Sequence, residues 1–323
     1  MTSATSLFSP VEADLSLLSE NLKGLVGARH PILHAAAEHL FGAGGKRIRP
    51  AVVLLLSRAT GSEQSLTAQH RRLAEITEMI HTASLVHDDV VDESAMRRGV
   101  PTVHSSFGNR IAVLAGDFLF AQSSWYLANL DNLEVVKLLS RVIMDLAEGE
   151  IQQGLNRFDT DLSIEAYLEK SYYKTASLMA NSAKAVGVLS AVSDDLKEQL
   201  YGYGRHLGLA FQIVDDILDF TSSSEALGKP AGSDLRSGNL TVPVLYAMQE
   251  QPALAQIIDR EFAEAGDFDK AIATIHQTCG IERSRTLAAD HTGQANACLA
   301  GLAPSPSRQA LLDITHYNLR RLH

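Results

Sequence analysis

The stretch LAEITEMIHTASLVHDDVVD at residues 73–92 decides the fold, because it combines helical spacing with a cluster of carboxylates at its end. Apolar residues such as Leu73, Ile76 and Ile80 recur three or four positions apart, which is the period of one helix face. The stretch LGLAFQIVDDILD at residues 207–219 repeats the same design. Alternating, strand-like patterns are scarce elsewhere, so the sequence predicts an all-α protein.

The composition is that of a globular chain. It has 323 residues, 46% of them hydrophobic and 20% charged, with a formal net charge of −10. No shift in composition marks a boundary, so we expect a single domain over residues 1–323. The acid excess argues against nucleic acid as a partner, since nucleic-acid binding needs a basic surface. No apolar run approaches the roughly 18 residues of a membrane span, which predicts no transmembrane segment.

The cysteines and the N-terminus bear on the compartment. Only Cys279 and Cys298 occur, with no CxxC pair and no zinc spacing. Residues 1–10 lack the basic start and apolar middle of a signal peptide. These features favour a reducing, cytoplasmic location.

Two DDxxD segments carry the chemistry: DDVVD, which begins at Asp88, and DDILD, which begins at Asp215. Positions i and i+4 of a helix share a face, so Asp88 and Asp92 project together, as do Asp215 and Asp219. Carboxylate oxygens select hard cations such as Mg²⁺, which keeps sites for water and phosphate. A single DDxxD copy is as typical of a solvated acidic helix end as of a metal site. Two copies favour facing helices that hold Mg²⁺ and a diphosphate.

Basic residues accompany both motifs. The segment GGKRIRP at residues 44–50 supplies three cations, Arg97 and Arg98 follow the first motif, and Lys174 and Lys229 come later. Arginine offers a planar fork of donors to phosphate, and lysine a mobile point charge. Taken alone, the segment 44–50 is more typical of a helix end and a surface turn. The absence of P-loop and GxGxxG patterns disfavours a nucleotide kinase or ATPase.

Glu78 and His81 form an ExxH pair, the metal motif of di-iron helical bundles. Such sites need a second ExxH, and the sequence has none, so a helical metal-storage protein is disfavoured. His81 lies seven residues before Asp88, two turns away on about the same face. His81 is therefore expected either to donate a hydrogen bond to phosphate or to be a histidine of the core.

At these residues the sequence resembles the trans-isoprenyl diphosphate synthases over nearly its whole length. The resemblance rests on the order and spacing of GGKRIRP at 44–50, the first acidic motif with RRG at 97–99, KT at 174–175, FQIVDD at 211–216 and GKPAGSDL at 228–235. It is similar above all to the long-chain members, the solanesyl diphosphate synthases of photosynthetic organisms. The resemblance implies an all-α bundle around a deep central cavity, usually a homodimer.

The resemblance also implies a reaction. An allylic diphosphate ionises with the help of Mg²⁺, isopentenyl diphosphate attacks the carbocation, and a proton is lost. The implied ligands of two or three Mg²⁺ ions are Asp88, Asp92 and Asp215, with Asp89, Asp216 and Asp219 close by. The implied contacts of the allylic diphosphate are Arg97, Lys174, Thr175, Gln212 and Lys229. Those of isopentenyl diphosphate are Lys46, Arg49, His81 and Arg98. The implied catalytic residues are Asp88, Asp92, Arg97, Lys174, Gln212, Asp215 and Lys229.

One position departs from the family pattern. The family usually has a lysine about where Asn239 stands, so one diphosphate contact is in doubt while the metal ligands remain. The polar, glycine-containing segment 221–243 is expected to be a loop that carries Lys229 over the phosphates as a lid.

Product length depends on the residues below the first motif. Ala83 and Ser84 lie about one turn before Asp88, where the short-chain members of the family place a bulky aromatic floor. Because both residues are small, the cavity is expected to continue toward Ile80. This predicts a product longer than geranylgeranyl, and the resemblance implies a solanesyl chain for a quinone side chain. The alternative is that the small residues only allow close helix packing.

The sequence bears on three other functions. Terpene cyclases usually replace the second DDxxD with a mixed motif, whereas this chain keeps it in full. A non-catalytic subunit of a heteromeric synthase tends to lose its acidic motifs, and this chain keeps both. A shorter-chain, geranylgeranyl-type synthase stays the main alternative. Because the product is so apolar, its release at a membrane surface through a peripheral contact stays an alternative.

Overall fold

The computed structural model describes residues 7–25, 31–42, 45–61, 66–97, 99–222 and 231–322. Within these ranges the regular secondary structure is helical apart from two strands of two residues each, which confirms the all-α prediction. The chain folds into two compact units. Unit 1 comprises Met1–Ile143, Asn181–Tyr201 and Leu299–Asp313, and unit 2 comprises Met144–Ala180, Gly202–Cys298 and Ile314–His323. A single domain over residues 1–323 stays a prediction.

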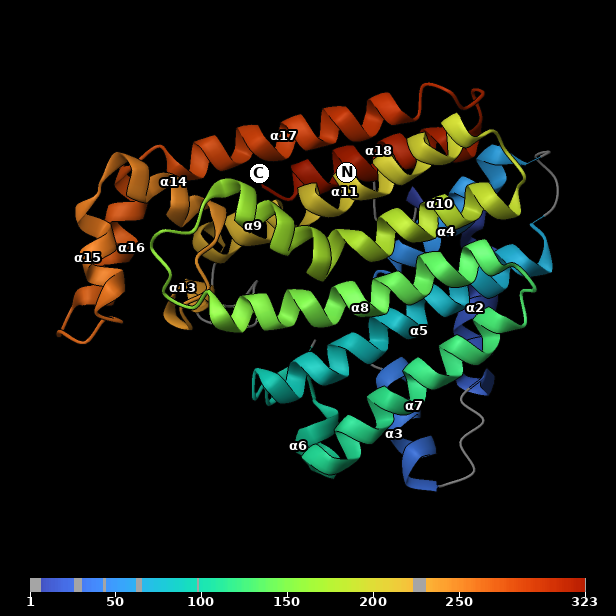
Figure 1. Ribbon diagram of the computed structural model, residues 1–323, viewed down its shortest axis with the longest axis horizontal. Helices are drawn as coiled ribbons and strands as arrows, with labels where there is room; N and C mark the ends of the chain where they lie inside the picture. Colours follow the sequence, from blue (N-terminus) through green and yellow to red (C-terminus); the bar gives the residue numbers. More distant parts are fainter. Residues whose placement is uncertain are drawn as a thin grey trace. The chain divides into compact units, whose positions relative to one another are not determined.

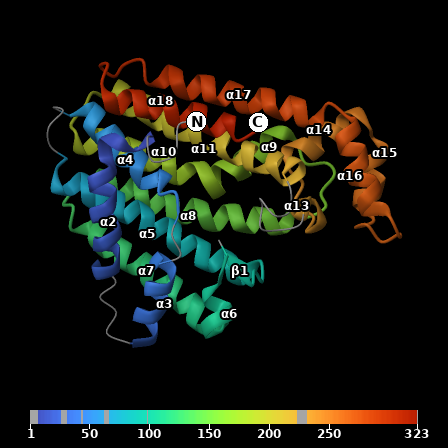
Figure 2. The same cartoon turned by 180° about the vertical axis from the view of Figure 1, so that it is seen from behind.

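The elements that lie wholly in unit 1 come from the N-terminal part of the chain. They are η1 (Ser9–Val11), α2 (Glu12–Leu25), α3 (Pro31–Gly42), α4 (Ile48–Thr60), α5 (Ala68–Val91), β1 (Met96–Arg97), β2 (Val100–Pro101), α6 (Val103–Phe107) and α7 (Asn109–Ala128). The strands β1 and β2 pair antiparallel in a short hairpin that follows the C-terminal end of α5 (Figure 2).

The elements that lie wholly in unit 2 are α9 (Ile164–Ser171), the π-helical turn η2 (Tyr172–Ala176), α13 (Ser233–Arg236), α14 (Val242–Glu250), α15 (Ala253–Asp259), α16 (Asp267–Gln277) and α17 (Gly280–Cys298). Four helices contribute residues to both units: α8 (Leu133–Leu155), α10 (Ser177–Leu189), α11 (Asp194–Thr221) and α18 (Pro306–Arg320).

The core of unit 1 is built around α5, which packs against α4 and α7 (Figure 1). Ile76 and Ile80 on the predicted apolar face are fully buried. Helix α4 buries every residue over Pro50–Ser57, as expected of a helix that is apolar nearly all round. A Cβ at Gly116 of α7 would lie 2.2 Å from Nε2 of His87. The glycine therefore lets α7 approach α5 closely.

The core of unit 2 joins α11, α14 and α17. Its fully buried side chains include Ile213 and Ile217 of α11, Val244 of α14 and Ala288 of α17. A Cβ at Gly208 would lie 2.5 Å from the Cα of Ala176, so α11 runs close to η2. This close approach brings the second acidic motif next to the π-helical turn, where a helix often carries functional residues.

The predicted breaks are confirmed in part. Helix α3 ends at Gly42 and α4 begins at Ile48, as the glycine-rich segment predicts. The loop predicted over residues 221–243 is wrong at two places, because α13 forms at Ser233–Arg236 and α14 begins at Val242. The part of the lid that holds Lys229 lies outside the described residues.

One described helix, α7, has the length and apolar composition of a membrane span, and 33% of its apolar window is buried. A single helix of this kind is weak support for a membrane segment, since core helices pass the same test. Leu114 and Trp125 on this helix are 47% and 65% exposed. They lie eleven residues apart, about three helical turns, and therefore share one face.

Candidate active site

The first acidic motif closes helix α5 in unit 1. Asp88 is half-buried, while Asp92 is exposed and caps the helix with its backbone N–H on the Asp88 carbonyl at 2.8 Å. Carboxylates at a helix C-terminus are unfavourable, because the helix dipole is negative there. A bound cation would relieve this repulsion, and the oxygens of Asp88 and Asp92 are of the kind that Mg²⁺ prefers.

Asp89 of this motif has a different environment. Its side chain is 5% exposed and accepts hydrogen bonds from Arg97 Nε at 2.8 and 3.0 Å, while Arg97 Nη2 lies 2.7 Å from Oδ1. Arg97, in strand β1, thus lies beside the first motif, as the sequence predicts. Its guanidinium, however, is paired with the carboxylate of Asp89. Arg98, the next predicted phosphate ligand, lies outside the described residues.

The structure brings two of the predicted isopentenyl diphosphate ligands together. Arg49 Nη1 lies 3.1 Å from His81 Nε2. Since a guanidinium can only donate, Nε2 of His81 accepts this hydrogen bond and is unprotonated. Lys46 is exposed just before α4. Glu78, the other member of the ExxH pair, forms a salt bridge with Arg47.

The second acidic motif lies in α11 of unit 2, with its three carboxylates in three environments. Asp215 is 55% exposed at its side chain and pairs with Arg321 Nη2 at 2.7 Å. Asp216 is buried and accepts hydrogen bonds from Tyr167 Oη at 2.5 Å and Gln212 Nε2 at 2.8 Å. Burial raises the pKa of Asp216 to about 8, and the nearby charge of Asp234 adds to this effect.

Asp219 anchors the segment of chain that begins with Gly232. It is 1% exposed, and its two oxygens accept hydrogen bonds from Ser233 Oγ at 3.0 Å and the Asp234 backbone N–H at 3.3 Å. The Gly232 N–H also donates to the Asp219 carbonyl at 2.9 Å. The roles of Asp216 and Asp219 as metal ligands stay predictions.

The predicted Lys174, Thr175 and Gln212 meet beside Asp216. Thr175 Oγ1 donates to Gln212 Oε1 at 2.7 Å, so the amide of Gln212 is held at both ends. Lys174 Nζ pairs with Glu150 Oε2 at 2.7 Å. The π-helical turn η2 places Lys174 and Thr175. Lys229 lies outside the described residues.

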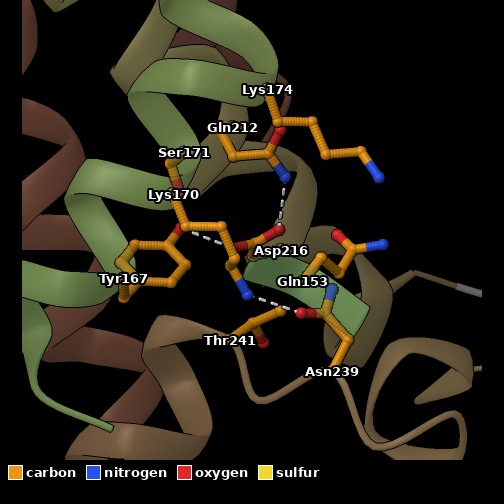
Figure 3. Close-up of a pocket in the computed structure, with 9 residues that line it drawn as sticks. All are labelled: Gln153, Tyr167, Lys170, Ser171, Lys174, Gln212, Asp216, Asn239 and Thr241. Carbon is orange, nitrogen blue, oxygen red and sulfur yellow. Dashed lines mark hydrogen bonds between the residues drawn. The ribbon is translucent and has the colours of Figure 1, made fainter. Parts of the chain in front are cut away.

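A small cavity of about 20 Å³ lies in this part of unit 2 (Figure 3). Its lining residues are Gln153, Tyr167, Lys170, Ser171, Lys174, Gln212, Asp216, Asn239 and Thr241. The sequence analysis missed Tyr167 and Lys170. Both precede Lys174 by about one or two helical turns, so the helical period could have found them.

The residues predicted to set product length lie within α5. Ile80 and Ala83 are fully buried, and Ser84 is half-buried with its hydroxyl donating to the His81 carbonyl at 2.9 Å. The small residues Ala83 and Ser84 thus lie about one helical turn before Asp88 on α5. Their role in product length stays a prediction.

Within the described ranges, no three or more His, Cys, Asp or Glu side chains gather closely enough to form a metal cage. Mg²⁺ is commonly held by only one or two carboxylates, with water and substrate phosphates completing its shell. The paired carboxylates of Asp88 and Asp92 fit that mode of binding.

Comparison with known proteins places these residues in a family. The family model for polyprenyl synthetases matches residues 30–275 of the chain. The chain is 69% identical to a prenyl transferase of Synechocystis sp., across 100% of both chains. It is 56% identical to solanesyl diphosphate synthase 1, chloroplastic, of Arabidopsis thaliana, over 99% of this chain and 80% of that protein.

A solved structure agrees. The fold is similar to that of a polyprenyl synthase from Caulobacter crescentus, crystallised with calcium and isoprenyl diphosphate. The TM-score is 0.91 at 36% identity, covering 99% of this chain and 98% of that one. The chain belongs to the polyprenyl synthetase family.

Proposed function

We propose that this protein is a Mg²⁺-dependent prenyltransferase that elongates an allylic diphosphate with isopentenyl diphosphate to a long all-trans polyprenyl diphosphate. The observation that carries the proposal is the retention of both full DDxxD motifs in a member of this family. The relatives named prenyl transferase and solanesyl diphosphate synthase support it.

The metal ligands are proposed from the chemistry of the carboxylates. Asp88, Asp92 and Asp215 would hold two or three Mg²⁺ ions. Mg²⁺, when bound, would neutralise the charge that develops on the diphosphate leaving group. Arg321, which now pairs with Asp215, would have to release that carboxylate.

The remaining residues bind and orient the substrates. Lys174, Thr175 and Gln212, with Arg97 and Lys229, would hold the allylic diphosphate through charge-assisted hydrogen bonds. Lys46, Arg49, His81 and Arg98 would hold isopentenyl diphosphate so that its double bond faces the allylic carbon. Apolar walls would exclude water, which would otherwise quench the cation.

We propose a solanesyl-length product for a quinone side chain. The small residues Ala83 and Ser84 on α5 and the solanesyl diphosphate synthases among the relatives support this length. The experiment that tests the function is incubation of the purified protein with farnesyl or geranylgeranyl diphosphate, isopentenyl diphosphate and Mg²⁺, followed by sizing of the products. A long polyprenyl diphosphate is expected. A product that stops at geranylgeranyl, a cyclised product, or no turnover by the chain alone would contradict the proposal.

We further propose that the protein is a cytoplasmic homodimer. The exposed apolar side chains Leu114 and Trp125 on one face of α7 support a second copy as their cover, since such patches mark interfaces. The two free cysteines, Cys279 and Cys298, are compatible with a reducing compartment. In size-exclusion chromatography with light scattering, Trp125→Glu should give monomers. The matched control is Lys23→Glu on α2, an exposed polar position that should leave the dimer intact.

A further inference from the structure

A buried lysine outside the predicted site residues lies in the cavity of unit 2. Lys170 on α9 is 5% exposed, and its ammonium donates to Asn239 Oδ1 at 2.7 Å (Figure 3). Its Nζ also lies 5.9 Å from the centre of the Tyr167 ring, and the nearby carboxylate of Asp216 attracts its charge. An ammonium carries three N–H donors. Lys170 therefore brings a positive charge into the cavity with two donors still to be used.

A second polar group in the same cavity lacks a partner. Thr241 is 2% exposed, and its Oγ1 is buried without a hydrogen-bond partner in the described structure. A buried hydroxyl without a partner is unfavourable, so Thr241 Oγ1 has the capacity for one more hydrogen bond. The cavity of about 20 Å³ has room for one group of the size of an oxygen atom.

The neighbouring carboxylate does not complete the site. Both oxygens of Asp216 already accept hydrogen bonds, from Tyr167 and from Gln212. The ammonium of Lys174 points away from that of Lys170 and pairs with Glu150 (Figure 3). Lys170 and Thr241 thus offer donors that suit an incoming oxygen with negative charge.

Asn239 is fixed rigidly enough to position Lys170. Its N–H donates to the Asp234 carbonyl at 2.9 Å and the Gly238 N–H to the Leu235 carbonyl at 3.0 Å, which together form a Schellman motif after α13. Gly238 has φ +82°, and a Cβ there would lie 2.5 Å from the Phe158 ring. The amide oxygen of Asn239 therefore sits at a defined place beside the cavity.

We propose that Lys170, held by Asn239, forms with Thr241 an oxyanion subsite that takes one phosphate oxygen of the diphosphate substrate. This inference rests on the proposed function. Lys174 and Gln212 line the same cavity, and the resemblance assigns both to the allylic diphosphate. The family pattern has a lysine about position 239, and here the cation reaches the side chain of residue 239 from α9 instead. Asn239 is thus a positioning residue: its amide oxygen holds the ammonium of Lys170 near the place where the family has its own lysine.

The test is a charge-relocation cycle, read by the binding of inorganic pyrophosphate with Mg²⁺ in isothermal titration calorimetry. Lys170→Met should raise the dissociation constant about ten- to hundredfold, the usual worth of hydrogen bonds to a charged group. Asn239→Lys alone adds a second cation beside Lys170 and should not weaken binding, since added positive charge favours an anion. The double variant Lys170→Met/Asn239→Lys should recover most of the affinity, because it restores one cation at the same place.

Two further variants secure the result. Thr241→Val keeps the shape of the side chain, removes only the hydroxyl and should raise the dissociation constant several-fold even if Lys170→Met folds poorly. Lys270→Met on α16 removes an exposed lysine of unit 2 and should leave binding unchanged. Wild-type affinity in Lys170→Met or Thr241→Val would overturn the subsite and leave a water molecule as the occupant of the cavity.

The failure of the subsite differs from the failure of the function. If the wild-type protein elongates prenyl chains while Lys170→Met binds pyrophosphate normally, only the subsite is wrong. If the wild-type protein neither binds pyrophosphate nor consumes isopentenyl diphosphate, the proposed function is wrong and the subsite falls with it.

Discussion

The two DDxxD motifs have the same letters but different surroundings. In unit 1 the motif ends helix α5, so Asp92 is exposed and Asp88 half-buried. In unit 2 the helix α11 continues to Thr221, and only Asp215 keeps an exposed side chain, while Asp216 and Asp219 are buried. The position of a motif within its helix thus decides how many of its carboxylates are at least partly exposed to solvent.

The cations follow the same division. Arg97 neutralises a buried aspartate of the first motif, whereas Arg321 covers the open aspartate of the second. In unit 1 the arginine thus pairs with a buried carboxylate, while in unit 2 it pairs with the carboxylate that we propose as a metal ligand. The comparison predicts that open carboxylates control activity and buried ones control stability.

The largest expected effect concerns the open carboxylates. Asp88→Asn and Asp215→Asn should each lower kcat by about 10²–10³-fold, because each removes charge that would hold Mg²⁺ against the leaving group. Their melting temperatures should stay near that of the wild type. Steady-state kinetics with saturating Mg²⁺ checks this, and Asp269→Asn, at an exposed position of α16, is the control. Full activity in either variant would contradict the statement that the exposed carboxylates control activity.

The next effect concerns the residues one turn before each motif. Ala83 and Ser84 precede Asp88, whereas Ala210 and Phe211 precede Asp215. Ala83→Phe should shorten the product by several isoprene units, since it closes the path below the first motif. Chromatographic sizing of the products checks this, with Ala253→Phe at an exposed site of α15 as the control. An unchanged long product would show that other walls set the length.

The buried carboxylates should act on stability. Asp219→Asn weakens the bonds to Ser233 and Asp234 and should lower the free energy of unfolding by about 1–3 kcal/mol. Asp92→Asn, at the exposed counterpart in the first motif, should change it by less than about 0.5 kcal/mol. Urea unfolding monitored by circular dichroism compares the two. Equal effects would remove the distinction between open and buried carboxylates.

A pH effect should distinguish Asp216 from the open aspartates. Burial raises the pKa of Asp216 from 3.8 to about 8, so the folded state holds its proton more tightly than the unfolded state. The stabilising contribution is therefore complete below about pH 4 and is lost as the pH rises through about 8. In metal-free protein, Asp216→Asn should flatten the decline of the melting temperature over this range. An unchanged slope would contradict the assignment.

The smallest effect concerns Arg321. Arg321→Gln should lower the Mg²⁺ concentration needed for half-maximal activity by about two- to fivefold, since an exposed ion pair is worth about 0.2–1 kcal/mol. Arg320→Gln is the neighbouring control. A higher Mg²⁺ requirement would mean that Arg321 assists the site instead of competing with the metal.

The sequence predicted what depends on local spacing. Helical periodicity found the buried face of α5, and the two motifs were recognised from their letters. It could not predict that Asp219 would anchor Ser233 and Asp234, because this contact needs the chain to return after α11. The contact of Lys170 with Asn239 likewise spans 69 positions of sequence. Contacts made by tertiary packing, and the short helix α13, were therefore found only in the structure.

The central claim is that the two motifs hold Mg²⁺ on one and the same diphosphate. The most direct measurement is a crystal structure of the protein with Mg²⁺, pyrophosphate and isopentenyl diphosphate. The account predicts that carboxylates of Asp88, Asp92 and Asp215 coordinate ions that share the pyrophosphate. Ions bound at only one motif, or pyrophosphate bound away from both, would contradict it.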